Sequence, residues 1–91
     1  MQQISGYVYL MRPIGSHMVY KIGRTTDLER RLITINRHLD HKLEYVFSLY
    51  VKDYDQAEQW LHRKFKSCHL SGEWFVLDDN EVTWIKSLTS I

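Results

Sequence analysis

The sequence predicts an α+β domain in which helices pack on a small antiparallel sheet, in the order ββαβα followed by a short extended piece and a last helix. Residues 6–12 (GYVYLMR) alternate in character as a strand does, and turn residues separate them from a second strand-like run at residues 17–22. Apolar residues recur at helical spacing from about residue 27. A third strand is expected at residues 42–51, which are rich in β-branched and aromatic side chains.

The two faces of the predicted hairpin differ in chemistry. Alternation places Val8 and Leu10 on one face of the first strand, opposite the face that holds Tyr7, Tyr9 and Met11. In the second strand one face holds Met18, Tyr20 and Ile22, and the other holds Val19 and Lys21. Gly23 is expected to end that strand.

Capping residues predict where the three helices begin. The first follows Thr26-Asp27-Leu28-Glu29, which has the form of a capping box. The second is expected to start after Asp53 or Asp55 and to run to about residue 67, and the third to start after Asp78 or Asp79. The buried stripe expected for the first helix comprises Leu28, Leu32, Ile35 and Leu39, with Arg31 beside it.

Composition limits the class of protein. The 91 residues predict one domain, residues 1–91, and the lone Cys68 excludes a disulfide framework. No apolar run approaches the roughly 20 residues of a membrane span, and the N-terminus lacks the pattern of a signal peptide, so we expect a cytoplasmic protein without membrane contact. Residues 12–42 carry a net charge of +4 within a chain whose net charge is +1, which favours an anionic partner.

Tyrosine and lysine side chains meet on one face of the predicted hairpin. A neighbouring Lys21 ammonium would lower the pKa of the Tyr9 phenol, or a partly desolvated lysine would accept its proton. The alternative is that the strand tyrosines simply pack the sheet. Arg24 and Arg31 suit bidentate contacts with phosphate near a positive helix N-terminus, although either is also an ordinary solvated side chain.

Glu58 and His62 lie one turn apart on the second predicted helix. They would share a metal ion, or the histidine would support a carboxylate ligand. The alternative is an ordinary pair on a solvated helix face.

Five segments in order, GYVYL, YKIGRTT, ERRL, AEQWLHRKF and GEWF, together resemble the GIY-YIG endonuclease family, in particular its compact phage and bacterial branch with a KIG second motif. The resemblance covers residues 6–86. It implies a three-stranded antiparallel sheet flanked by helices, and it implies metal-dependent hydrolysis of DNA phosphodiester bonds.

The resemblance also implies roles for individual residues. Tyr9, assisted by Lys21, would activate the attacking water, and Arg31 would stabilise the charge on the scissile phosphate. Glu58 would hold Mg²⁺ or Mn²⁺. Further DNA contacts are expected from Arg24, Arg30 and Arg37, and supporting roles from Tyr7, Tyr20, Gly23, His62 and Glu73. The chain departs from the family pattern at Lys21, a change that some active relatives share, and at Ile35 and Leu70. For Leu70, His62 or Glu73 would be the compensating residue.

Two other functions remain open from the sequence. One is a DNA-binding module that keeps the fold and has lost the chemistry. The other is a protein-interaction domain whose partner surface is formed by Trp60, Trp74, Phe75 and Trp84. For a DNA-binding protein, the expected source of specificity is a homodimer or a partner protein, since no recognition module is attached.

Overall fold

A single antiparallel sheet forms the centre of the structure, a computed structural model that describes residues 3–91. Within those residues the sheet has five strands in the order β3-β1-β2-β5-β4. The strands are β1 (Gly6–Pro13), β2 (Val19–Thr25), β3 (Leu43–Val51), β4 (His69–Ser71) and β5 (Trp74–Val76). All the pairings are antiparallel.

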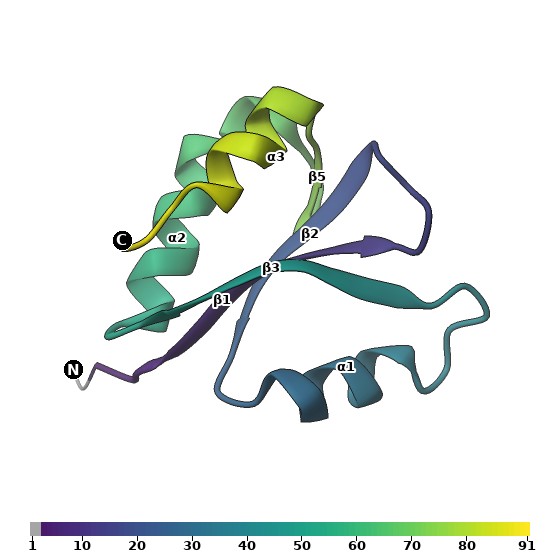
Figure 1. Cartoon of the computed structure of the whole chain (residues 1–91), viewed down its shortest axis with the longest axis horizontal. Coiled ribbons are helices and arrows are strands. Elements are labelled where there is room, and N and C mark those ends of the chain that lie inside the picture. Colours follow the sequence, from purple (N-terminus) through teal and green to yellow (C-terminus); the bar gives the residue numbers. More distant parts are fainter. Residues whose placement is uncertain (1–2) are drawn as a thin grey trace.

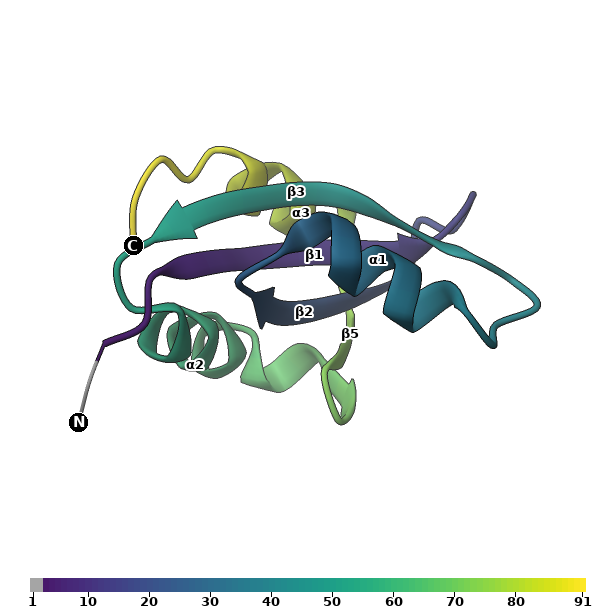
Figure 2. The same ribbon diagram turned by 90° about the horizontal axis from the view of Figure 1, so that it is seen from below.

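Helices cover both faces of this sheet. They are α1 (Leu28–Asn36), α2 (Tyr54–Lys64) and α3 (Asp79–Lys86), with a short 3₁₀ helix, η1, at Lys66–Cys68. Figure 1 shows α2 and α3 on one side of the strands and α1 on the other. Seen from below, α1 lies across the sheet over β1, β2 and β3 (Figure 2). None of the helices in residues 3–91 is long and apolar enough to cross a membrane.

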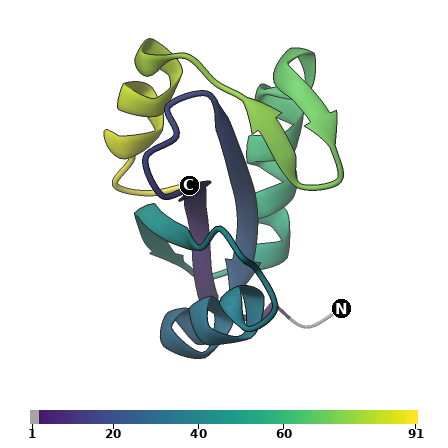
Figure 3. The ribbon, with the colours of Figure 1, turned by 90° about the vertical axis from the view of Figure 1, so that its right-hand side faces the viewer.

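The expectation of a three-stranded sheet is wrong, because β4 and β5 extend the sheet beyond β2. The second helix ends at Lys64 rather than near residue 67, and the chain returns as a hairpin beside α2 (Figure 3). Gly72 adopts a positive φ of 54°, a conformation that glycine adopts without steric cost, and it lies in the hairpin turn. The new strand pairs with β2, where Tyr20 lies opposite the buried Phe75.

The alternation predicted for β1 is confirmed, and it divides the core into two clusters. Val8 and Leu10 belong to the larger cluster, which includes buried residues of α2 and α3. Tyr9 and Met11 form the smaller cluster with Leu43. Packed against the smaller cluster are Leu28, Leu32, Ile35, Tyr45 and Trp74. Since α1 has no fully buried residue, that helix is held by partial burial and by polar contacts at its ends.

The N-caps of α2 and α3 follow the prediction, and that of α1 differs in detail. Asp53 and Asp78 accept hydrogen bonds from the first turns of α2 and α3. Asp27, rather than Thr26, caps α1 by accepting from the backbone N–H of Arg30 at 3.0 Å. Leu39 was expected in the buried stripe of this helix, but α1 ends at Asn36, so Leu39 lies beyond the helix and is 38% exposed.

Gly23 does not end its strand, as the sequence had suggested, because β2 continues to Thr25. Residues Lys21 and Gly23 therefore share one face of β2, and Ile22 and Arg24 share the other. This extension is what brings Arg24 alongside α2 and Gly23 under the ring of Tyr9.

Candidate functional site

The basic residues of α1 differ from most of those on the sheet in having no acidic partner. Within residues 3–91, the salt bridges join Arg12 to Glu44, Lys21 to Glu73, and Arg24 to Asp55 and Glu58. Three arginines take part in none of these pairs and are exposed: Arg30 and Arg31 within α1, and Arg37 at its C-cap. Their positive charge is therefore available to an anion from solvent.

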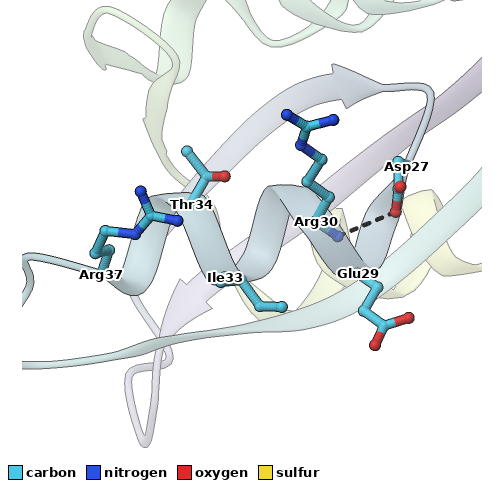
Figure 4. A pocket seen from close by; sticks show the side chains of 6 residues that line it. All are labelled: Asp27, Glu29, Arg30, Ile33, Thr34 and Arg37. Carbon is cyan, nitrogen blue, oxygen red and sulfur yellow. Dashed lines mark hydrogen bonds between the residues drawn. The ribbon is translucent and has the colours of Figure 1, made fainter.

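These arginines line two neighbouring surface pockets that have lining residues in common. One pocket, of about 440 Å³, is lined by Arg30, Thr34 and Arg37 together with Asp27, Glu29 and Ile33. A second pocket, of about 500 Å³, shares Arg30 and Thr34 and adds Arg31. In Figure 4, Arg30, Thr34 and Arg37 project from the same side of α1, and Glu29 and Ile33 project from the other. We call the surface formed by Arg30, Arg31, Thr34 and Arg37 the α1 basic face.

The first turn of α1 adds polar groups to one end of this face. A smaller pocket of about 250 Å³ is lined by Arg24, Thr25, Thr26, Arg31, Tyr54 and Glu73. Thr25 is fixed there because its hydroxyl oxygen accepts from the backbone N–H of Asp27 at 3.1 Å. Sequence analysis did not single out Thr25, Thr26 or Tyr54 as site residues, since threonines beside a turn and a tyrosine at a helix start carry no distinctive pattern.

Arg24 lies at the border of this pocket and is bound by two carboxylates. Its Nη1 donates to Glu58 Oε1 at 2.9 Å, and its Nη2 lies 2.9 Å from Asp55 Oδ1. The guanidinium also lies 5.1 Å from the centre of the Tyr54 ring. From the sequence, Arg24 was predicted to contact phosphate. Asp55 was predicted only as a possible helix cap, because an aspartate near a helix start is typical of a cap.

Glu58 is buried, with 6% of its surface exposed. Burial is the largest cause that raises the pKa of this carboxyl group, Glu73 raises it further, and Arg24 opposes both. Glu58 Oε1 is bonded to Arg24, whereas Oε2 is buried and has no hydrogen-bond partner among the described residues. Glu58 Oε2 is thus a buried acceptor without a partner in the described part of the chain.

The divalent cation expected on Glu58 stays a prediction, and the residues as they are arranged do not fit it. One carboxylate oxygen is bonded to a guanidinium, and the other is closed off from solvent. Within residues 3–91 no group of three or more His, Cys, Asp or Glu side chains could hold a metal ion. A hydrated Mg²⁺ would need an accessible oxygen here.

Tyr9 and Lys21 project from the α1 side of the sheet, as alternation predicted. Lys21 Nζ lies 3.1 Å from Glu73 Oε1, so the lysine is paired with a carboxylate. Burial raises the pKa of the Tyr9 phenol, and Glu73 raises it further, although Arg31 acts in the opposite direction. The lowered Tyr9 pKa expected from a neighbouring ammonium is therefore not what the structure supports.

The residues that were expected to support the site lie on both faces of the sheet. Tyr20 is buried in the larger cluster, and His62 Nε2 lies 2.9 Å from the carbonyl oxygen of Ile22. Tyr7 packs edge-on against Tyr50, with the ring centres 5.2 Å apart. His62 and Glu73 were the two residues suggested as compensating for Leu70. Of these, Glu73 lines the pocket that contains Arg31, and His62 does not.

The fold and the site define a small α+β domain with an exposed basic helix on one face of its sheet. The chain matches the family model described as the T5orf172 domain over residues 6–89, and it belongs to that family. It is also 36% identical over 80 residues to the putative KilA-N domain-containing protein 315L of Invertebrate iridescent virus 6. That alignment covers 81% of this chain and 34% of the viral protein, so the chain corresponds to about a third of that relative. No solved structure matches the chain.

These comparisons correct the family expected from the sequence motifs. The matching family is the T5orf172 domain and not GIY-YIG, so the prediction of GIY-YIG membership is wrong. The prediction of an endonuclease rested on that membership and is corrected with it. No finding tests the individual roles expected of Tyr9, Lys21 and Arg31, which stay predictions. The geometry reported above does not depend on the family.

Proposed function

We propose that this T5orf172 domain binds DNA through contacts between the α1 basic face and backbone phosphates. The observation that carries the proposal is that Arg30, Arg31 and Arg37 are exposed, unpaired in residues 3–91 and joined by shared pockets. Arginine suits this role because its planar guanidinium donates two parallel hydrogen bonds to phosphate oxygens.

The dimensions of α1 agree with a short segment of backbone. At about 1.5 Å of rise per residue, Arg30 and Arg37 are separated by roughly 10 Å along the helix axis. One strand of duplex DNA carries a phosphate about every 3.4 Å along its axis, so the stretch from Arg30 to Arg37 spans about three phosphates.

The family comparison supports this function over the other alternative from the sequence. A T5orf172 domain that resembles a viral KilA-N domain-containing protein agrees with the alternative of a DNA-binding module. Phosphate contacts carry no sequence information, so we expect binding with little sequence preference. A homodimer or partner protein as the source of specificity stays a prediction.

Titration of a fluorescently labelled duplex at low salt tests the proposal. We expect Arg30→Ala to weaken binding about fivefold, which corresponds to roughly 1 kcal/mol for an exposed charge contact. The matched control is Arg63→Ala, because Arg63 is also exposed but lies on α2, outside the α1 basic face. Equal affinities for the two variants would contradict the proposal.

A further inference from the structure

Arg24 adjoins the α1 basic face but differs from it electrostatically. The small pocket that contains Arg31 also contains Arg24, yet two Arg24 nitrogens already lie 2.9 Å from the carboxylates of Asp55 and Glu58. These three ionised side chains together carry a net charge of −1. A phosphate that approached Arg24 would therefore meet a local charge that repels it.

We propose that Asp55 and Glu58 form an acidic clamp that withholds Arg24 from DNA and so limits the affinity of the α1 basic face. The inference rests on the proposed function, and it assigns Asp55 a role in regulating that surface. Phosphate and carboxylate compete for the same donors, because a guanidinium offers its paired N–H groups to either. With the clamp closed, the basic face ends at Arg31.

The two halves of the clamp differ in accessibility. Glu58 is buried, and its side chain is 8% exposed. Asp55 lies in the first turn of α2, and its side chain is 53% exposed. Exposed ion pairs contribute little to stability, so Asp55 can be altered with little effect on folding. Tyr54 holds the Arg24 guanidinium beside the pocket through its ring, independently of Asp55.

Replacing Asp55 with asparagine tests the clamp. We expect Asp55→Asn to increase affinity for a labelled duplex at low salt by about threefold to tenfold, and to steepen the salt dependence by about one phosphate contact. The matched control is Asp79→Asn, which removes the same charge from an exposed position at the start of α3, on the other side of the sheet from α1 (Figure 1). This control should change affinity less than twofold.

A gain in affinity in Asp55→Asn has two possible causes: Arg24 becomes free to bind phosphate, or a repulsive charge is removed. The variant Arg24→Ala distinguishes these two causes. In the otherwise unchanged protein we expect Arg24→Ala to lower affinity, because it leaves Asp55 and Glu58 without their cation and makes the local charge beside the α1 basic face more negative. Combined with Asp55→Asn, it should return affinity to the starting value. The clamp is overturned if Asp55→Asn behaves like Asp79→Asn, or if the double variant still binds more tightly than the unaltered protein. If neither the unaltered protein nor Asp55→Asn binds DNA, the proposed function fails as well. If binding depends on Arg30 but Asp55→Asn does not increase the affinity, only the clamp is refuted.

Discussion

Tyr9 lies directly over Gly23 on the neighbouring strand. A Cβ atom at position 23 would lie 2.5 Å from the Tyr9 hydroxyl oxygen and 2.6 Å from Cζ of the same ring. Glu73 Oε1 would be 3.0 Å away. Glycine at position 23 is therefore needed for close approach of a buried ring to the strand, and its backbone angle plays no part.

This relationship predicts that Gly23→Ala destabilises the fold by about 1–3 kcal/mol, the usual cost of overpacking. Tyr9 is only 2% exposed, so its ring cannot move into solvent without losing its burial. Urea unfolding followed by fluorescence measures the change. Tyr9→Phe should rescue little of the loss, because Cζ of the ring would still lie 2.6 Å from the new Cβ atom. An unchanged midpoint in Gly23→Ala would contradict this packing.

The buried Tyr9 phenol predicts a loss of stability at alkaline pH. Its folded-state pKa is raised above the ordinary value of 10, so the folded protein binds this proton more tightly than the unfolded chain does. The resulting stability is complete below pH 10 and decreases as pH rises above it, by at most about 1.4 kcal/mol per pH unit. The free energy of unfolding of the unaltered protein should therefore fall more steeply than that of Tyr9→Phe between about pH 10 and pH 11. Parallel curves would show that Tyr9 titrates normally.

Tyr45 fastens the start of α1 to the sheet. Its hydroxyl donates to the carbonyl oxygen of Leu28 at 2.8 Å. We expect Tyr45→Phe to cost about 1 kcal/mol, as for a typical intramolecular hydrogen bond. Tyr50→Phe is the control, because the hydroxyl of exposed Tyr50 has no hydrogen bond within residues 3–91. Chemical denaturation of both variants checks the difference, and equal stabilities would argue against this anchor.

The start of α3 depends on a reciprocal cap. Asp78 accepts from the backbone N–H of Glu81 at 2.8 Å, and the Glu81 side chain accepts from the backbone N–H of Asp78 at 2.9 Å. Asp78→Ala should lower the free energy of unfolding by about 1 kcal/mol. The neighbouring Asp79→Ala should lower the free energy of unfolding by at most a few tenths of the loss expected for Asp78→Ala. Thermal unfolding of the two proteins distinguishes these outcomes.

Local patterns in the sequence were enough to predict much of the fold. Alternation in β1 assigned Val8 and Tyr9 to opposite faces correctly, and Asp53 and Asp78 cap the helices that they were expected to cap. Both are short-range effects. The short extended piece predicted before the last helix corresponds to β5, but its pairing with β2 was missed because it joins segments distant in the chain. The strand β4 was not predicted, because a three-residue strand shows too little alternation to be recognised.

The sequence predicted which residues lie close together in the candidate site better than it predicted how their charges pair. Arg24 and Arg31 do line one pocket, and Glu58 is bonded to Arg24. What could not be foreseen is that Asp55 and Glu58 pair with Arg24 while the α1 arginines stay unpaired. Ion pairing depends on tertiary distances that residue spacing along the chain does not reveal.

The salt dependence of DNA binding tests the central claim most directly. For binding through phosphate contacts, the logarithm of the association constant falls linearly with the logarithm of salt concentration, with a slope of about −0.9 per contact. The account predicts that replacing Arg30, Arg31 and Arg37 together by alanine makes this slope shallower by about 2.7. A triple variant whose slope and affinity equal those of the unaltered protein would contradict it.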